Sequence, residues 1–449
     1  MIQINSEYVM IGGVLLIILA DLLRVMLRVD SRRIIHYITL LVLIIAFITE
    51  VMFGNMDVSF FSSMQYSGFI NGFILFLSIA IYLFLMSDSG EHSVFIDFLF
   101  LFATLGALLV VISSNFISLI IAIEMISIAS YGLVFFHKTD RQLEGAMKYV
   151  SISFLSIIIV IFGTSMIYGG SGSLSFSITS TQNYLPFIAG VGLVLAGLSF
   201  KSTIVPFHMW APDVYEASDG TITAFLSSVS KTAGLVAMIR VFFFALPFSS
   251  NFVMVMFVTL AIATIFFASF MAIVQDKIKR ILAYSSIAQA GFAFIGIAML
   301  NLLGVRSAIF YVFTFAVADV LVFLAYKVFE DNKIVYKKDS KRMFLTSKVA
   351  TIGLFVGLLS LAGLPPTVGF FGKLLIFQTL LTHGYVYIVV ALFAIILFST
   401  FYYFGLIREM ELSKVNGIVR KPIPGRRIKE AVIIVLVLTL FIGVAFVPF

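Results

Sequence analysis

The sequence predicts an all-α membrane protein of about fourteen transmembrane helices, and three observations carry this prediction. The 449 residues are 61% hydrophobic and only 11% charged, against roughly 25% charged in soluble domains. Apolar runs close to the roughly 20 residues that a helix needs to cross a bilayer recur along the whole chain. When the runs are numbered in order, lysine and arginine occur only in the connections that come after odd-numbered runs. A soluble core could not bury this much apolar surface, so lipid is the expected solvent of most of the chain.

The apolar runs set the expected helices. In chain order they cover residues 8–27, 34–53, 67–86, 93–112, 115–137, 147–168, 184–205, 220–246, 251–273, 279–300, 304–327, 347–382, 384–407 and 430–448. At a rise of about 1.5 Å per residue, most of them match a hydrocarbon core of roughly 30 Å. The run at 347–382 is too long for one straight helix, and Pro365-Pro366 interrupts it.

The charges of the connections test this count independently. Arg28 and Arg32 follow the first run, Lys138 follows the fifth, and Lys277 and Lys279 follow the ninth. The connections after the eleventh and thirteenth runs are also basic, whereas those after even-numbered runs contain no lysine or arginine. One miscounted helix would destroy this alternation. Because positive loops stay in the cytoplasm, we expect a multi-pass plasma-membrane protein with both termini on the non-cytoplasmic side.

Two of the runs are broken in a similar way. Pro206 and Pro212 interrupt the seventh run, and Pro365-Pro366, beside Gly363, interrupts the twelfth. Paired interrupted helices in two halves indicate an inverted-repeat transporter, with the freed backbone groups buried in protein or water. The sequence therefore predicts two inverted five-helix repeats, runs 4–8 and 9–13, with discontinuous helices 7 and 12. The expected division is 1–92 for the first three helices, 93–247 and 251–407 for the repeats, and 408–449 for a loop and the last helix.

Composition also limits the chemistry of the chain. It contains no cysteine, which excludes cysteine-ligated iron–sulfur clusters and disulfides within it. The five histidines show no metal or haem spacing, and no dinucleotide or phosphate-binding motif is present. We therefore expect no cofactor and no metal in this chain. The net charge of +7 fits basic cytoplasmic loops and does not argue for nucleic acid.

Charged residues inside the apolar runs are the candidate functional residues. These are Glu124, Lys201, Lys231, Lys373 and Asp319. A charge at the bilayer centre costs about 2.5–3.5 kcal/mol on insertion scales, so a charged residue there indicates a functional or structural role. Burial disfavours an ammonium and a nearby carboxylate favours it, so a buried lysine near an acid can load and release a proton. The first four side chains are therefore predicted to form a proton-transfer row, with Glu124 modulating Lys201 and Lys231 and Lys373 continuing it. Hydroxyls such as that of Ser228 are expected to hold connecting water.

Other interpretations stay open for several of these residues. Glu124 can also serve as a polar contact between helices, and Lys201 and Lys373 can satisfy carbonyls at the breaks. Lys231 is too deep to reach an interface, which favours function, while Asp319 either pairs with a lysine or contacts water. Three further residues are possible auxiliaries: Glu144 and Lys148, an i, i+4 pair, and His208. His208 and Trp210 stand beside a break, where such side chains are usually interface anchors.

The motifs around the breaks identify a family. The stretch Gly197–Glu216, with Lys201, Pro206 and Pro212-Asp213-Val-Tyr-Glu, resembles the central motif of the antiporter-like proton-pumping subunits of respiratory complex I. Its form is most similar to the NADH-quinone oxidoreductase subunit N type. The stretches 275–291 and 360–373 resemble the family's signatures around helices 9–10 and helix 12. Glu216-Ala-Ser-Asp219-Gly and Asp319 depart from the family pattern.

The resemblance implies a function. It implies a non-redox subunit of a proton-translocating quinone oxidoreductase, with Glu124, Lys201, Lys231 and Lys373 at the family's proton-transfer positions. The expected partners are other membrane-arm subunits, lipid and protons, and quinone is reduced elsewhere in the complex. A free-standing or Mrp-type cation/proton antiporter subunit, the membrane subunit of an energy-converting hydrogenase, and a structural subunit that no longer pumps remain alternatives.

Overall fold

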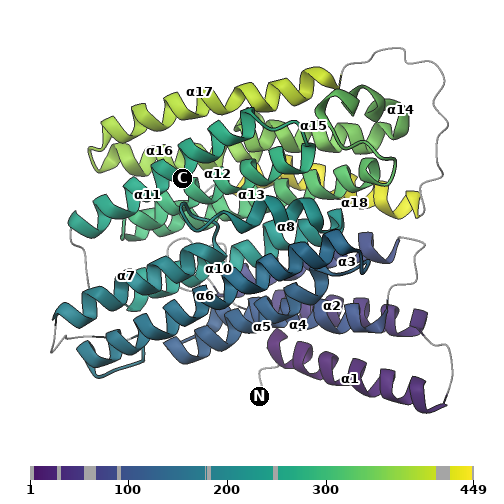
Figure 1. Ribbon diagram of the computed structural model, residues 1–449, viewed down its shortest axis with the longest axis horizontal. Coiled ribbons are helices and arrows are strands. Elements are labelled where there is room, and N and C mark those ends of the chain that lie inside the picture. The colour runs from purple at the N-terminus through teal and green to yellow at the C-terminus, as the bar shows by residue number, and fades with distance from the viewer. Residues whose placement is uncertain are drawn as a thin grey trace.

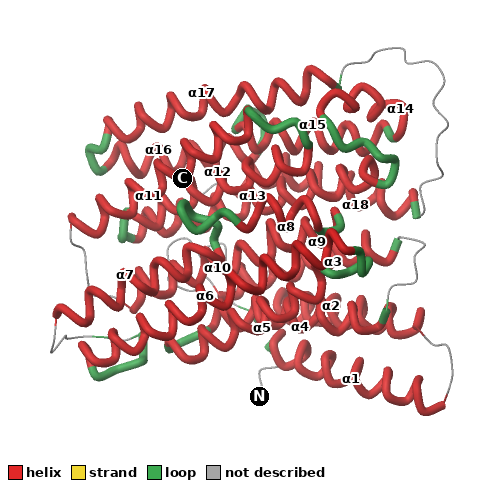
Figure 2. The backbone as a smooth tube through the Cα atoms, in the orientation of Figure 1, coloured by secondary structure: helices red, strands yellow, loops and turns green. Residues whose placement is uncertain are grey.

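The computed structural model describes residues 5–27, 32–54, 67–87, 93–176, 178, 184–245, 251–410 and 425–446. Within these residues the chain is helical almost throughout and contains no strand (Figure 2). The helices run side by side, with the N-terminal helices along one edge of the bundle and α17 along the other (Figure 1). The predicted all-α class is confirmed. Arg28, Lys414, Arg420 and Lys421, which contribute to the charge alternation, lie outside the described residues.

The helices follow the predicted order closely. They are α1 (Ser6–Leu27), α2 (Arg32–Phe53), α3 (Ser67–Met86), α4 (Val94–Ile112), α5 (Phe116–Val134), α6 (Asp140–Ser171), α7 (Tyr184–Lys201), α8 (Trp210–Ala217), α9 (Gly220–Phe225), α10 (Lys231–Ile239), α11 (Asn251–Ile273), α12 (Ile278–Ala298), α13 (Leu302–Glu330), α14 (Met343–Thr346), α15 (Lys348–Ala362), α16 (Val368–Thr382), α17 (Val386–Glu409) and α18 (Arg426–Ile442). Two π-helical segments, Leu226–Ser230 and Arg240–Ala245, flank α10.

Twelve helical segments among the described residues are long and apolar enough to cross a membrane. The two short helices at the second break, α15 and α16, are apolar but have only 15 residues each. The count of fourteen spans therefore stays a prediction, as does the division into four parts. One boundary differs clearly: α6 begins at Asp140, not near residue 147, because the Thr139 side chain accepts a hydrogen bond from Gln142 and caps the helix.

The two predicted breaks are present. The first separates α7 from α8 over residues 202–209, and the second separates α15 from α16 over residues 363–367. Gly363 ends α15 in the left-handed region at φ 81°, which favours glycine. The two broken elements run in opposite directions in Figure 1, as an inverted repeat requires. As a result α7, which ends in Lys201, and α16, which carries Lys373, both lie on the left of their breaks.

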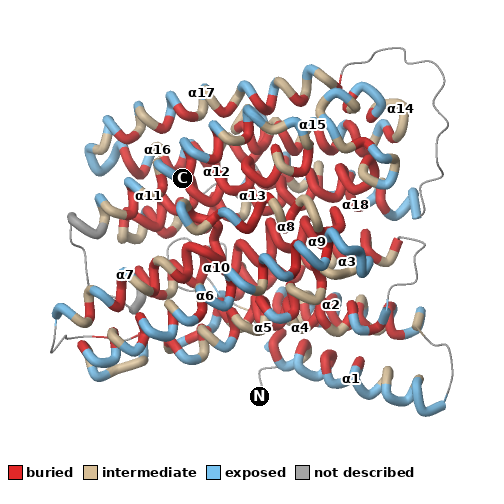
Figure 3. Tube along the Cα trace, in the orientation of Figure 1, coloured by how far each residue is buried: buried red, intermediate tan, exposed pale blue. Residues whose placement is uncertain are grey.

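Burial divides the helices into an inner and an outer set. The membrane-spanning windows of α12 and α13 are 100% and 94% buried, and both helices lie at the centre of the bundle (Figure 3). Outer helices such as α6 and α17 keep large apolar side chains exposed, for example Phe154 and Phe401. Exposed apolar surface of this extent fits a membrane protein, whose outer helices are covered by lipid or by neighbouring membrane subunits. Of the charged candidates, Lys231 and Asp319 lie on such inner segments, Gly220–Phe243 and α13, which are 100% and 94% buried.

Candidate functional site

Lys201 lies at the end of α7, directly at the first break. Its side chain is 4% exposed, and its Nζ donates to the Tyr149 hydroxyl at 3.2 Å and to Ser127 Oγ at 3.3 Å. Glu124 is half-buried on α5, three residues before Ser127 and so on the same face of that helix. Within the described residues no ion pair of 4 Å or less joins Lys201 to Glu124. The predicted neighbourhood is present, but a hydroxyl pair rather than the carboxylate contacts the ammonium.

Aromatic rings hold the first break in place. Trp210 stacks on Tyr149 with ring centroids 4.5 Å apart and donates its indole N–H to the Phe200 carbonyl at 3.0 Å. Trp210 is buried, and His208 is buried with its ring edge-on to Phe267 at 4.8 Å. The expectation that both are interface anchors is therefore wrong. The reason is that the connector folds back into the protein, so these side chains pack against the bundle instead of facing headgroups.

Lys231 faces Asp319 through a serine. Its Nζ donates to Ser286 Oγ at 2.5 Å, and Ser286 Oγ donates to Asp319 Oδ2 at 2.5 Å. Lys231 and Asp319 are each 1% exposed, on α10 and α13, and Ser286 is fully buried on α12. The π-helical segment Leu226–Ser230 directly precedes Lys231, and such segments occur often at functional sites. Of the two interpretations of Asp319, the structure shows the pairing with a lysine.

Lys373 contacts the backbone of the second break. Its Nζ donates to the carbonyl of Leu361 at 2.8 Å and to that of Ala362 at 2.9 Å. These are the last carbonyls of α15, which have no partner within a helix that stops at Gly363. The ammonium also lies 5.1 Å from the centre of the Phe292 ring. The predicted structural role is thus present at Lys373, beside any role in proton transfer.

Neutral polar side chains lie between the lysine of α10 and the lysine of α16. Gln289, on α12 with Ser286, donates to the Leu361 carbonyl at 3.1 Å, the same oxygen that accepts from Lys373. Its amide also donates to the Tyr403 hydroxyl at 2.7 Å, which lies 2.6 Å from Ser285 Oγ. One hydrogen-bonded group therefore contains Lys231, Ser286 and Asp319, and a second leads from Ser285 to Lys373; Ser285 and Ser286 are neighbours in the sequence of α12. Sequence reasoning missed these residues because neutral polar side chains in an apolar run are common contacts between helices.

The passage from Lys201 to Lys231 is also polar. The Tyr149 hydroxyl, which accepts from Lys201, lies close to Ser230, the residue before Lys231. The hydroxyls of Ser202 and Thr203 at the break are buried and have no hydrogen-bonding partner. Buried hydroxyls without a partner mark positions that water commonly fills.

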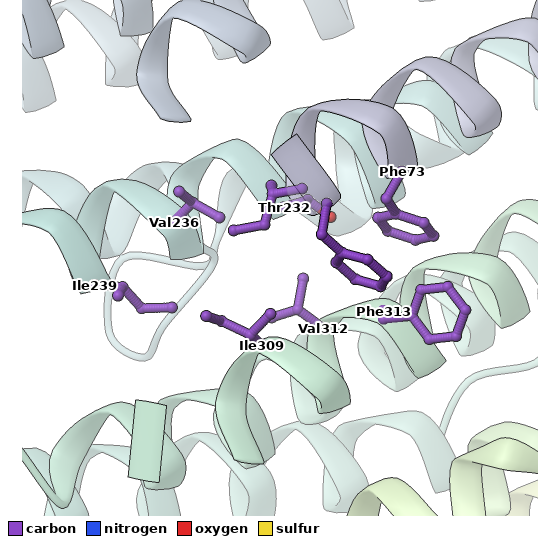
Figure 4. A pocket seen from close by; sticks show the side chains of 9 residues that line it. Phe73, Thr232, Val236, Ile239, Ile309, Val312 and Phe313 are labelled. Carbon is purple, nitrogen blue, oxygen red and sulfur yellow. The ribbon is translucent and has the colours of Figure 1, made fainter. Parts of the chain in front are cut away.

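A small cavity nearby is not part of this row. It has a volume of about 10 Å³ between α3, α10 and α13, and Figure 4 shows its lining side chains. Phe73, Ile309 and Phe313 are among them, and Thr232 supplies the one polar side chain. A buried water needs two to four polar partners, so this cavity stays dry.

Ion pairs at the connector tie the first half of the protein to the second. Arg280 of α12 contacts Asp213 at 2.7 Å and Glu216 at 3.0 Å, both on α8. Lys148 contacts Glu144 at 2.8 Å and Asp213 at 3.4 Å, with both Lys148 and Glu144 side chains largely exposed. Burial acts to raise the pKa values of Asp213 and Glu216, but their cationic partners hold both below the ordinary range. Glu144 and Lys148 thus belong to this exposed network and not to the buried row.

Asp219 forms a second tie between the halves. Its carboxylate contacts Lys327 at 2.7 Å and His137 Nε2 at 3.0 Å, and it accepts from the Thr221 amide at 2.8 Å. Burial works to raise its pKa, yet the charge of Lys327 and these hydrogen bonds hold the pKa well below the ordinary value. This residue departs from the family pattern, and in this chain it caps α9 and binds α13.

Two broken, oppositely directed helices around a row of buried lysines define a class of protein: an antiporter-like ion-translocating membrane subunit. The comparison with known families agrees. The model of the NADH:quinone oxidoreductase/Mrp antiporter transmembrane family matches residues 113–399, and the chain belongs to this family.

Named relatives narrow the position within it. NADH-quinone oxidoreductase subunit N of Moorella thermoacetica is 36% identical over 321 residues, covering 70% of this chain and 67% of the relative. F(420)H(2) dehydrogenase subunit N of Methanosarcina mazei is 32% identical over 447 residues, covering 92% and 89%. A chain of respiratory complex I from Thermus thermophilus, 24% identical, superposes with a TM-score of 0.81 and covers 97% of both chains. The resemblance to the subunit N type is confirmed.

Proposed function

We propose that this chain is a proton-translocating membrane-arm subunit of a complex I-type quinone oxidoreductase. The observation that supports it most is the row of three buried lysines, Lys201, Lys231 and Lys373, each hydrogen-bonded to polar groups of the bundle. A buried lysine binds a proton when a carboxylate is near and releases it when the carboxylate moves away. The row supplies three buried lysines, with a carboxylate near the first and another linked to the second through Ser286.

Each residue has a distinct part in this proposal. Glu124 is half-buried beside the Lys201 region. When its carboxylate approaches Lys201 it favours the protonated lysine, and when the two separate the lysine loses its proton more easily. Lys231 passes its proton along Ser286 as its pairing with Asp319 changes. Lys373 receives it through the Gln289 region, where the carbonyls of the second break stabilise the charged form. His208, buried without a partner on Nδ1, is an auxiliary candidate near the first break.

The rest of the assembly supplies the driving reaction. We propose that the chain holds no redox cofactor and that quinone is reduced in other subunits, in a plasma membrane with both termini on the non-cytoplasmic side. The absence of cysteine and of nucleotide motifs supports the first point. The names of the two relatives include different electron donors, NADH and F420H2, which supports a donor site outside this kind of subunit.

The test is Lys231→Ala in the assembled complex, with Lys348→Ala on an exposed position of α15 as the matched control. Proton uptake and quinone reduction are measured together in reconstituted vesicles. We expect the proton-to-electron ratio to fall in the Lys231 variant and to stay at the wild-type value in the control. A normal ratio in an intact Lys231→Ala complex would refute the assigned role.

An Mrp-type cation/proton antiporter subunit is the second candidate, because the matching family includes both kinds of protein. Purification of the tagged chain from its own membrane separates the two. A complex I-type subunit brings iron–sulfur proteins with it, and an antiporter subunit does not.

A further inference from the structure

Helices α1 to α3 enclose a second group of buried titratable side chains. Glu7 in the first turn of α1, Glu50 in the last turn of α2 and Asn71 in the second turn of α3 are 7%, 6% and 1% exposed. These helices carry no member of the lysine row, and α1 lies along one edge of the bundle (Figure 1). The proposed function therefore gives these two glutamates no role.

Within the part of the chain that the structure describes, no basic side chain compensates the charges of this group. No lysine, arginine or histidine forms an ion pair with either glutamate among the described residues. On the elements that pack against them, α2 contributes Glu50, α3 contributes only Tyr82, and α4 contributes only Asp97. Asp97 and Tyr82 pair with each other near His36, about 20 Å away along α2 at 1.5 Å per residue. The hydroxyl of Ser6, the residue before Glu7, donates to Glu50, so the two carboxyl groups are neighbours. Two neighbouring buried carboxylates disfavour the doubly ionised form, which favours a bound cation.

The amide of Asn71 indicates which cation. Its Nδ2 donates to Glu7 Oε1 at 2.8 Å, so the Asn71 amide lies against the Glu7 carboxyl group. Its Oδ1 is buried and has no hydrogen-bonding partner among the residues that the structure describes, and leaving a buried carbonyl oxygen without a partner is costly. A proton on the second oxygen of Glu7 can be donated to this Oδ1, closing a cyclic acid–amide pair. Ser6 Oγ donates to Glu50 Oε2, which suits an ionised Glu50.

We propose that Glu7 binds one exchangeable proton, shared with the amide oxygen of Asn71 and facing an ionised Glu50. This is a proton-binding site outside both repeats, at the end of α1–α3 opposite to Arg32. The site is distinct from the lysine row, because in the described ranges it shares no residue and no hydrogen bond with it.

The test compares Glu7→Gln with the wild-type complex. Glutamine keeps both hydrogen bonds, since its carbonyl accepts from Asn71 Nδ2 and its amide donates to Oδ1. Infrared spectra of the purified complex are recorded at pH 7 in H2O and D2O, with Glu144→Gln as an exposed control. We expect one protonated-carboxyl band of the wild-type spectrum to be absent from the Glu7→Gln spectrum. This band should weaken as the pH rises, and it should persist in Glu144→Gln. Loss of only carboxylate bands in Glu7→Gln would overturn the proposal.

A second measurement separates a proton from a metal cation. Carbodiimide reacts with protonated buried carboxyl groups, and mass spectrometry of the α1 and α2 peptides counts the adducts. We expect one adduct per pair at pH 7, unchanged when NaCl replaces choline chloride. Protection by NaCl at constant pH would show a sodium site and contradict the assignment of a proton.

Discussion

Asp319→Asn is the most informative perturbation of the buried row. Asparagine has the shape of the carboxylate and still accepts from Ser286, so the packing of α12 against α13 is kept. What disappears is the negative charge that faces Lys231. The matched control is Asp331→Asn at the exposed residue directly after α13, which removes a carboxylate beside Lys327.

The magnitude follows from the geometry. Two consecutive hydrogen bonds of 2.5 Å join Lys231 Nζ to Asp319 Oδ2 through Ser286. At a separation of about 5 Å and an effective dielectric constant of about 20, the attraction is worth about 3 kcal/mol. Losing it lowers the ratio of ammonium to amine at Lys231 by roughly two orders of magnitude. Protonation of Lys231 then requires a more acidic solution, by up to about two pH units.

The assay is proton translocation coupled to quinone reduction in inverted vesicles, measured from acidic to alkaline pH. We expect Asp319→Asn to slow coupled turnover roughly 10-fold or more at neutral pH and to move the optimum toward acid. Asp331→Asn should keep the wild-type profile. An unchanged rate and optimum in an assembled Asp319→Asn complex would refute the coupling of these two residues.

Two further variants test the breaks and the ties between the halves. Gly363→Ala places a Cβ 2.7 Å from Lys373 Cδ at φ 81°, so we expect a loss of about 1–2 kcal/mol and a lower Tm of the complex; an unchanged Tm would contradict the geometry. Asp219→Asn removes the anion beside Lys327. Because the folded-state pKa of Asp219 lies below its ordinary value, its stabilisation is present above about pH 4 and is lost as pH falls through the folded pKa. The Tm difference between this variant and wild type should therefore be largest near neutral pH and shrink in acid; a difference independent of pH would exclude this linkage.

The fold was predictable because the bilayer constrains the sequence in simple ways. Span length follows from membrane thickness, and basic loops follow from topology, so both are local properties of the chain. The breaks were equally local, since Pro206 and Pro365 cannot continue a helix that needs its backbone amides. The start of α6 was misplaced because the cap at Thr139 lies in a polar stretch without an apolar signal.

The candidate site was predictable only as a set of residue types. Charges in apolar runs identified Lys231 and Asp319 one by one, but their meeting across Ser286 depends on how α10, α12 and α13 pack. Gln289 could not be found in the sequence, because a neutral amide carries no signal until its partners are known. Trp210 was misassigned for the same reason: the connector that carries it folds inward.

The central claim is that protons move along a connected row and not between separate ion pairs. Gln289→Leu tests it most directly, because it removes the link to Tyr403 and to the Leu361 carbonyl while leaving every charge in place. Gln378→Leu, on an exposed position of α16, is the matched control. The measurement is the proton-to-electron ratio of the reconstituted complex. A connected row predicts a lower ratio in Gln289→Leu and a normal one in the control, whereas a normal ratio in an intact Gln289→Leu complex would contradict it.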